Sequence, residues 1–246
     1  MTFHLKRLGT TAAIVGLLAL GAVAVDGQAA RAEGLRVSPV TLEVEAPGAT
    51  TSLALRNDGS QPITIQTRVY RWVQKGGVER YEPTRAVVVS PPMTRLAPGA
   101  KQSVRVVRTD KSRVTGEEAY RVFVDEVPDM SLNKAGTVAF VTRLRIPVFF
   151  VTAGAHLPQV RWSLTRDSGV AVLEAQNTGD VRLRLADLEL VQGGNTVDRH
   201  EGLFGYVLGG ASMRFPLGSA SKFHNGPLSL QATTSRGPLN ATVTQR

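Results

Sequence analysis

The sequence contains no cysteine in its 246 residues. This absence excludes disulfide bridges, thiolate metal ligands and a thiol nucleophile. A chain without disulfides must be stabilised by burying a hydrophobic core. Its length and its hydrophobic fraction of 42% are sufficient for one large domain or two ordinary ones.

The residue patterns of common enzyme sites are also absent. No serine occurs in a G-x-S-x-G motif, and His200-Glu201 lacks the second histidine of an H-E-x-x-H zinc site. Asp125 and Glu126 are neighbours in an expected strand, so they point to opposite faces and do not form a carboxylate pair. Four histidines share no metal-ligand spacing: His4, His156, His200 and His224. The sequence therefore predicts no enzymatic activity, no metal site and no cofactor.

The sequence has one long hydrophobic run, at its N-terminus. Lys6 and Arg7 precede an almost unbroken apolar segment, residues 8–25, and Ala30-Arg31-Ala32 offers a small-residue cleavage site. This layout is typical of a secretory signal peptide, residues 1–32, and we expect cleavage after Ala32. The run also has about the minimum length of a membrane anchor, which is the alternative. Cleavage would leave an exported protein without stable membrane insertion.

Basic residues outnumber acidic ones, 29 to 20, which gives a formal net charge of +9. Removal of residues 1–32 takes away three basic residues and one acidic residue, and leaves +7. Such an excess suits nucleic acid or another anionic partner. However, the basic residues are scattered singly, with no run of five or more. We therefore expect an affinity for acidic partners and no nucleic-acid binding.

Apolar and polar residues alternate along almost the whole chain after Gly34, which is typical of half-buried strands. The first half predicts about seven strands, at 35–44, 52–56, 63–72, 87–89, 102–108, 119–127 and 137–150. The second half predicts shorter ones, at 159–164, 170–177, 183–192, 205–208, 213–217, 228–233 and 240–244. This number and spacing indicate an all-β fold of two immunoglobulin-like β-sandwich domains, residues 33–152 and 153–246.

The expected strand at 137–150, TVAFVTRLRIPVFF, is unusually long. Strands of about 5–6 residues are typical. One side would carry Val138, Phe140, Thr142, Leu144 and Ile146. The other would carry Ala139, Val141, Arg143, Arg145 and Pro147. A long apolar strand is either covered by its own sheet or exposed as a template for another chain. Both possibilities stay open at this point.

Four segments resemble, in order, one family: LRNDGSQPITIQTRVYRW (55–72), SPPMTRLAPGAKQSVRVVR (90–108), EEAYRVFVDEVP (117–128) and TRLRIPVFF (142–150). Together they resemble the N-terminal domain of the PapD-like periplasmic pilus-assembly chaperones. Residues 177–179, 184–190 and 205–210 resemble the second domain of that family more loosely. The segments YRVFVDEVP and RIPVFF are similar to the archaic branch, which assembles spore-coat-U-type pilins. The resemblance implies an L-shaped arrangement of the two sandwiches with a cleft between them.

The resemblance also implies a function. Such a chaperone lends its long strand to a pilin subunit that lacks a strand, and delivers the subunit to an outer-membrane usher. The donor side chains would be Val138, Phe140, Thr142 and Leu144. The implied location is the periplasm, the implied partners are pilin or fimbrial subunits and the usher, and the free protein could cap its donor strand by self-association. The alternative is that this face covers the protein's own core.

The sequence departs from the family pattern at the residues that hold the subunit's terminal carboxylate. The usual arginine near the first strand and lysine near the last are absent, because Pro39-Val40-Thr41 and Arg145-Ile146-Pro147 stand there. We hypothesise that Arg121 is the anchor, with Arg143 or Arg145 assisting, since a buried carboxylate needs a charge-assisted donor. An exposed strand arginine without this role is an equal alternative.

Two further expectations follow from the resemblance. Glu126 matches a glutamate at the family's domain interface, although Val151 stands where its basic partner would be. The competing function is an exported structural or adhesive surface-fibre protein made of tandem sandwiches. A polymerising subunit would normally have an incomplete sandwich, whereas the first domain here has its full number of expected strands.

Overall fold

A computed structural model describes residues 34–128 and 141–246. The predicted signal peptide and two predicted donor residues, Val138 and Phe140, lie outside the described residues. Among the described residues, the one helical element is the short 3-10 turn Ala220–Lys222, and all other regular structure is β-strand. No described helix has the length and apolar character needed to cross a membrane. The all-β prediction is confirmed.

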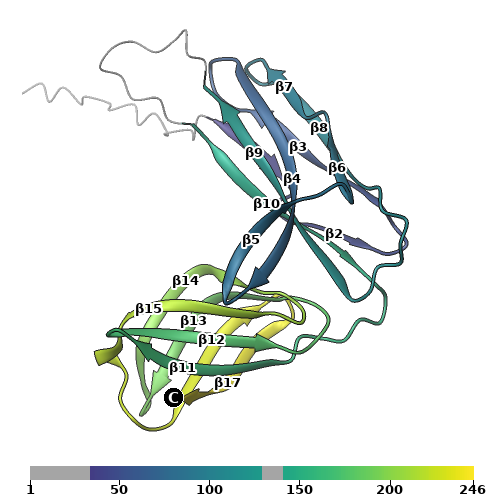
Figure 1. The fold of residues 1–246 in the computed structure, drawn as a ribbon. Helices are drawn as coiled ribbons and strands as arrows, with labels where there is room; N and C mark the ends of the chain where they lie inside the picture. The colour runs from purple at the N-terminus through teal and green to yellow at the C-terminus, as the bar shows by residue number, and fades with distance from the viewer. Residues whose placement is uncertain (1–33, 129–140) are drawn as a thin grey trace, which may run out of the picture. The chain divides into compact units, whose positions relative to one another are not determined.

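The first sandwich is built from two sheets (Figure 1). Its strands are β1 (Leu35–Ser38), β2 (Leu42–Glu45), β3 (Thr50–Asn57), β4 (Ile63–Lys75), β5 (Val78–Pro83), β6 (Val87–Ser90), β7 (Met93–Leu96), β8 (Lys101–Arg108), β9 (Glu117–Val127) and β10 (Arg143–Val151). One sheet has the order β1-β3-β8-β6, and the other has β2-β10-β9-β4-β5, with β7 also paired to β4. Fully buried side chains from both sheets, among them Leu55, Val104, Val122 and Phe150, form one core.

The predicted single strand at 35–44 is wrong, because the structure divides it between the two sheets. β1 pairs antiparallel with β3, whereas β2 pairs parallel with β10. Pro39 lies between them and has no N–H group to continue a ladder. Val40, which the alternation placed in the strand, is 69% exposed.

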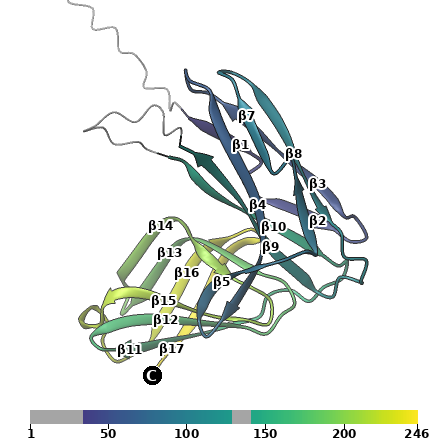
Figure 2. The same ribbon diagram turned by 45° about the horizontal axis from the view of Figure 1, so that its top comes forward.

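Two strands, β5 and β7, were not predicted, and β5 belongs to a hairpin with β4. β4 continues to Lys75, and the turn Gly76-Gly77 leads directly into β5, which pairs back along β4. Both glycines have positive φ, +64° and +78°, as a two-residue hairpin turn requires. The sequence of β5, VERYEP, lacks an apolar alternation and ends in proline, so its pattern does not reveal a strand. Figures 1 and 2 show this hairpin reaching the strands of the second sandwich.

The second sandwich contains β11 (Val160–Asp167), β12 (Val170–Asn177), β13 (Leu183–Gln192), β14 (Asn195–Val207), β15 (Ser212–Ser219), β16 (Leu228–Thr234) and β17 (Gly237–Gln245). These strands form one continuous sheet in the order β14-β13-β16-β17-β11-β12-β15. The two edge strands meet, since the rings of Phe204 in β14 and Phe215 in β15 lie 4.8 Å apart. The sheet therefore curls over a single core. The predicted domain boundary falls in the connection between β10 and β11.

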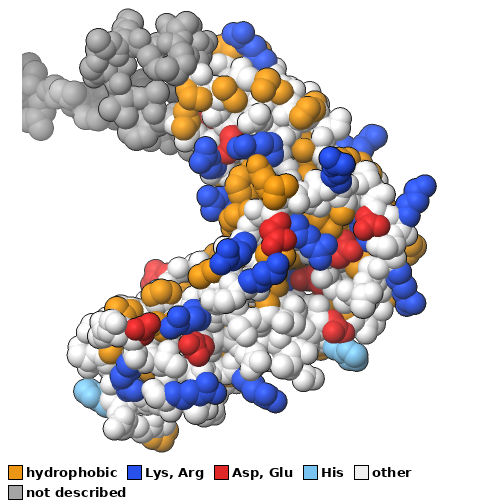
Figure 3. Space-filling model, in the orientation of Figure 1, with side chains coloured by type: hydrophobic (Ala, Val, Ile, Leu, Met, Phe, Trp, Pro, Cys, Tyr) orange, Lys and Arg blue, Asp and Glu red, His pale blue; other side chains and the backbone are white. Residues whose placement is uncertain are grey.

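Strand positions in the second sandwich agree with the alternation, except at β14. This strand begins at Asn195, ten residues before the predicted start at Gly205. Its early part contains Asp198-Arg199-His200-Glu201, whose polar character hides a strand at the edge of the sheet. Lys and Arg side chains are spread over both sandwiches on the face seen in Figure 3, as the scattered basic residues of the sequence predict.

Each sandwich contains a fully buried asparagine that closes a turn. The amide nitrogen of Asn57 donates to the carbonyls of Gln61 (2.7 Å) and Leu96 (3.1 Å), and its Oδ1 accepts from the N–H of Gly59 (2.9 Å). Asn177 has the same role in the second sandwich, where it bonds the backbone of Val181 and Gly179. A buried amide with every bond made fixes the turn, because no water is there to replace a lost partner.

We predict that Asn57→Ala lowers the free energy of unfolding by about 2 kcal/mol, because it leaves buried backbone groups without partners. Gln61→Ala, at an exposed side chain four residues away, should change it by less than about 0.5 kcal/mol. Chemical denaturation of the two variants measures the difference. Equal stabilities would contradict the structural role of Asn57.

A polar network closes one end of the first core. Arg108 donates two hydrogen bonds to Glu118, at 2.9 and 2.8 Å, and the hydroxyl of Tyr120 donates a third at 2.9 Å. Arg71 in turn donates to the Tyr120 hydroxyl at 3.1 Å. The bond from Arg108 holds the pKa of Glu118 below its usual value, and burial raises the pKa of Tyr120 to about 12.

The lowered pKa of Glu118 predicts a pH-dependent stability. A carboxyl whose folded pKa is depressed stabilises the fold above its unfolded pKa, about 4.3, and this contribution is lost as the pH falls through the folded pKa. Glu118→Gln should therefore cost about 3 kcal/mol at pH 7, and the gap to the unmodified protein should narrow below about pH 4. Denaturation at several pH values measures this gap.

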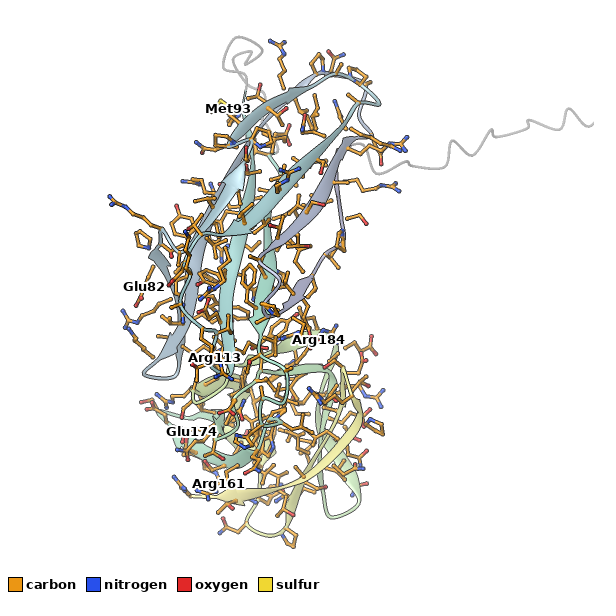
Figure 4. The ribbon with its side chains drawn as sticks, turned by 90° about the vertical axis from the view of Figure 1, so that its right-hand side faces the viewer. Glu82, Met93, Arg113, Arg161, Glu174 and Arg184 are labelled. Atoms are coloured by element: carbon orange, nitrogen blue, oxygen red, sulfur yellow. The ribbon has the colours of Figure 1, made fainter. Side chains whose placement is uncertain are left out.

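The control is Glu82→Gln, at a side chain labelled in Figure 4 that is 45% exposed and pairs only with Lys75 among the described residues. It should be nearly silent at every pH. A gap for Glu118→Gln that stays constant down to pH 3 would show that the carboxylate charge does not stabilise the fold.

Candidate functional site

β10 has one free edge along its first half. β9 pairs with all of β10, from Arg143 to Val151, but β2 pairs only with Val148–Val151. The N–H of Glu126 donates to the carbonyl of Thr142 at 2.9 Å. Because hydrogen-bonding direction alternates in an antiparallel pair, the backbone groups of Arg143 and Arg145 point away from β9. Among the described residues, no strand receives them.

The two faces of β10 differ as the alternation predicts. Ile146, Val148 and Phe150 are buried in the first core. Leu144 is partly buried and packs against the same core. From Leu144 onward, this face of β10 therefore covers the protein's own interior. Thr142 lies just before the strand, and its N–H donates to the carboxylate of Glu126 at 3.2 Å. The predicted start at Thr137 lies outside the described residues.

Arg121 lies on the opposite face of the sheet from the core. Its neighbours Tyr120 and Val122 are fully buried, while Arg121 stands opposite Pro147 in β10 and Tyr70 in β4. The guanidinium carbon lies 3.7 Å from the ring centre of Trp72, and Nη1 donates to the carbonyl of Arg145 at 3.2 Å. The arginine therefore extends over Pro147 to the free edge of β10.

The charge of Arg121 is poorly compensated. Burial lowers the pKa of its guanidinium, and the nearby carboxylate of Glu79 offsets this only in part. Among the described residues no carboxylate forms an ion pair with it, and its buried Nε has no hydrogen-bond acceptor. The buried indole N–H of Trp72 also has no acceptor there. A partly buried cation with an unused donor is suited to binding an anionic oxygen.

The two other predicted arginines have different surroundings. Arg143 already has an anionic partner, Asp125, at 2.8 Å, although it shares this carboxylate with Arg68. Arg145 has no ion pair among the described residues, and its guanidinium lies 5.1 and 5.4 Å from the rings of Phe123 and Tyr81. Hydrophobic side chains and Lys or Arg side chains lie side by side near the middle of the face in Figure 3.

The described residues form one compact unit, in which the two sandwiches contact each other beside Arg121. A small buried cluster joins Trp72, Ala119 and Phe149 of the first sandwich to Tyr206 and Leu208 of the second. The rings of Trp72 and Tyr206 meet edge to face, with centres 5.3 Å apart. Sequence patterns do not reveal this cluster, because its members come from strands that are far apart in the chain.

Ion pairs border the same contact. Arg182 of the second sandwich pairs with Glu117 and Glu43 of the first, and its guanidinium lies 3.5 Å from the ring centre of Phe149. Burial nevertheless raises the pKa of Glu117. Desolvation thus outweighs the attraction of Arg182 for this carboxylate, and the pair fixes geometry more than it adds stability.

Glu126 is not brought to this contact. It lies nine residues beyond Glu117 in β9, about 30 Å along the strand, and bonds Thr142 instead. The glutamate at the interface is Glu117, at the beginning of the same strand. The resemblance to the family did not distinguish between the two ends of β9.

The poor compensation of Arg121 predicts that it does not stabilise the isolated protein. Arg121→Met keeps contact with Trp72 and removes the desolvated charge, so the free energy of unfolding should stay within about 0.5 kcal/mol or rise. The matched control Arg182→Met leaves two carboxylates without their partner and should cost about 3 kcal/mol. Chemical denaturation measures both. A loss above 1 kcal/mol for Arg121→Met would contradict this account.

Residues 34–155 match the family model described as pili and flagellar-assembly chaperone, PapD N-terminal domain. A search of curated protein sequences finds no match. Solved structures of similar fold extend over both sandwiches, at sequence identities that show the fold alone.

Three of these structures illustrate the likeness. One is the CsuC-CsuE chaperone–tip subunit pre-assembly complex from archaic chaperone-usher Csu pili of Acinetobacter baumannii, with 22% identity, a TM-score of 0.68, and coverage of 86% of this chain and 99% of that chain. Another is the Salmonella enterica SafA pilin in complex with the SafB chaperone, with 19% identity, a TM-score of 0.59, and coverage of 86% and 97%. The third is the E. coli chaperone DraB, with 17% identity, a TM-score of 0.56, and coverage of 86% of this chain and 97% of that chain. The first sandwich therefore belongs to the family of PapD N-terminal domains of pili and flagellar-assembly chaperones.

Proposed function

We propose that this protein is a periplasmic chaperone that captures pilin subunits by donor-strand complementation and passes them to an outer-membrane usher. The observation that carries the proposal is the free edge of β10 next to Arg121, whose charge is poorly compensated among the described residues. An exposed strand edge offers main-chain hydrogen bonds to a foreign strand, and the arginine offers a charged contact at one end of that edge.

The comparisons support this reading. The family is one of assembly chaperones, and two of the similar structures are complexes of a chaperone with a pilin or tip subunit. The similarity to the Csu complex also favours the archaic branch for this chain. The periplasmic location, the usher and the capping of the free edge by self-association are expected from the same likeness, together with the signal-peptide pattern.

The donated side chains are proposed to be Val138, Phe140, Thr142 and Leu144. The first two would supply the large apolar contacts, because Leu144 already packs partly against its own core. Each apolar side chain that a subunit buries would contribute about 1.5–3 kcal/mol. The backbone groups of Arg143 and the N–H of Arg145 would add main-chain bonds to the added strand, whereas the carbonyl of Arg145 already accepts from Arg121.

The subunit's terminal carboxylate is proposed to bind Arg121. Such a carboxylate would complete the hydrogen bonding of a guanidinium that lies at the end of the free edge. Arg145 would assist, since its own charge has no ion pair among the described residues. Arg143 is the weaker candidate, because Asp125 already occupies it.

A structural or adhesive fibre protein is the less favoured function. A polymerising subunit has a sandwich with a missing strand, which leaves its core open. In the first sandwich, both sheets contribute to a core whose central side chains are fully buried. The family match also favours the chaperone.

Co-expression with a pilin subunit that lacks its last strand tests the proposal. We expect a soluble one-to-one complex, measured by light scattering after size exclusion. Arg121→Met should weaken capture by about tenfold or more, the effect of losing one charge-assisted contact. Arg161→Met, at an exposed strand arginine of the second sandwich labelled in Figure 4, is the matched control and should not change capture.

The outcomes separate the two parts of the proposal. If the unmodified protein forms no complex and instead polymerises, the chaperone function is wrong. If Arg121→Met captures subunits as well as the unmodified protein does, the carboxylate anchor is wrong, although the strand edge could still be the binding element.

A further inference from the structure

We propose that the second sandwich forms part of the carboxylate site: Tyr206 is one wall of the Arg121 guanidinium site, and Gln74 is the positioning residue that holds it there. This inference rests on the proposed function and deepens it. The anion would be the chain-terminal carboxylate of the bound subunit. The second sandwich would then act in subunit binding itself.

Gln74 joins the two sandwiches through a pair of hydrogen bonds. Its Nε2 donates to the carbonyl of Tyr206 at 2.8 Å, and its Oε1 accepts from the N–H of Leu208 at 2.9 Å. The side chain is only 8% exposed. The amide thus bonds the carbonyl of Tyr206 and the N–H of Leu208 in the way that the backbone of a neighbouring strand would. It therefore fixes the backbone on both sides of Val207, and with it the position of the Tyr206 ring.

A second contact keeps the end of the hairpin in place. The carbonyl of Gly77, in the turn after β4, accepts from the N–H of Arg214 at 3.0 Å, and Gly77 bridges to Met213. A Cβ atom at Gly77 would lie 2.5 Å from the Cγ of Arg214. Because the hairpin is held at Gly77 as well as at Gln74, β4 cannot rotate away from Tyr206 about a single contact.

Tyr206 completes an aromatic surround for the arginine. The guanidinium carbon of Arg121 lies 3.7 Å from the ring centre of Trp72 and 5.5 Å from that of Tyr206. Tyr206 is 3% exposed and also packs against Phe149, with ring centres 6.1 Å apart. Two ring faces near one guanidinium attract its charge and exclude water from it. A carboxylate that binds there meets a desolvated, oriented donor, which strengthens the charged bond.

The surround differs from ordinary core packing in one respect. Arg121 and Trp72 each keep a buried N–H without an acceptor among the described residues. A cluster selected only for stability would not retain both, because each buried donor without an acceptor destabilises the fold. Retention of both donors favours a site shaped for an anionic oxygen.

The test measures affinity for one pilin subunit in two forms, with a free C-terminal carboxylate and with a C-terminal amide. Tyr206→Leu and Gln74→Met should weaken binding of the carboxylate form by about tenfold and bring it close to that of the amide form. Tyr206→Phe keeps the ring and should match the unmodified protein. Gln66→Met makes the same substitution on the same face of β4, away from Tyr206, and should also be silent.

The readout separates positioning from general loosening. A structural defect alone would weaken both subunit forms equally, and that result would overturn the inference, as would unchanged affinity in Tyr206→Leu and Gln74→Met. Failure of the unmodified protein to bind either form would overturn the proposed function, and this inference with it. Thermal unfolding of all four variants, read alongside, shows which of them keep the native fold.

Discussion

The arrangement at the centre of the molecule depends on one interaction, the stacking of the Arg121 guanidinium on Trp72. Arginine is the residue suited to this position, because its planar group is weakly hydrated and can lie flat on a ring while its N–H groups stay directed at acceptors. Stacking offsets part of the desolvation that lowers the pKa of Arg121. Stacking leaves the Nε–H of the same group without an acceptor among the described residues, so no ion pair among these residues would have to break for an anionic oxygen to bind as proposed.

The free edge of β10 is compatible with a stable sandwich because the strand is held elsewhere. Val148–Val151 has strands on both edges, and Phe149 and Phe150 are fully buried on opposite faces. Within the part of the chain that the structure describes, Arg143–Pro147 has a strand partner on one edge only, but its ladder with β9 is continuous. The firmly held segment Val148–Val151 therefore keeps Arg143–Pro147 in an extended conformation. Pro147 fits this division, since its missing N–H lies on the side away from β9.

Much of this arrangement can be read from the sequence, within clear limits. Alternation of Tyr120, Val122 and Val124 places Arg121 on the outer face, as the structure confirms. Spacing alone does not say which residues stand opposite it. Gln74 and Tyr206 are 132 positions apart, and no local pattern links them. The same limit explains Glu126: its strand is predicted correctly, but only the packing of the second sandwich shows that Glu117 lies at the contact.

The contact between the sandwiches explains why β4 and β5 extend beyond the length that the first core needs. β4 has 13 residues. Near its end, the outward-facing side chains of Trp72 and Gln74 contribute nothing to the main core of the first sandwich. Trp72 instead supports Arg121, and Gln74 bonds the second sandwich. A shorter hairpin would close the first domain equally well but would leave the arginine exposed to water, where a guanidinium binds a carboxylate weakly. The extension therefore gives Arg121 a partly buried, oriented environment that neither sandwich supplies alone.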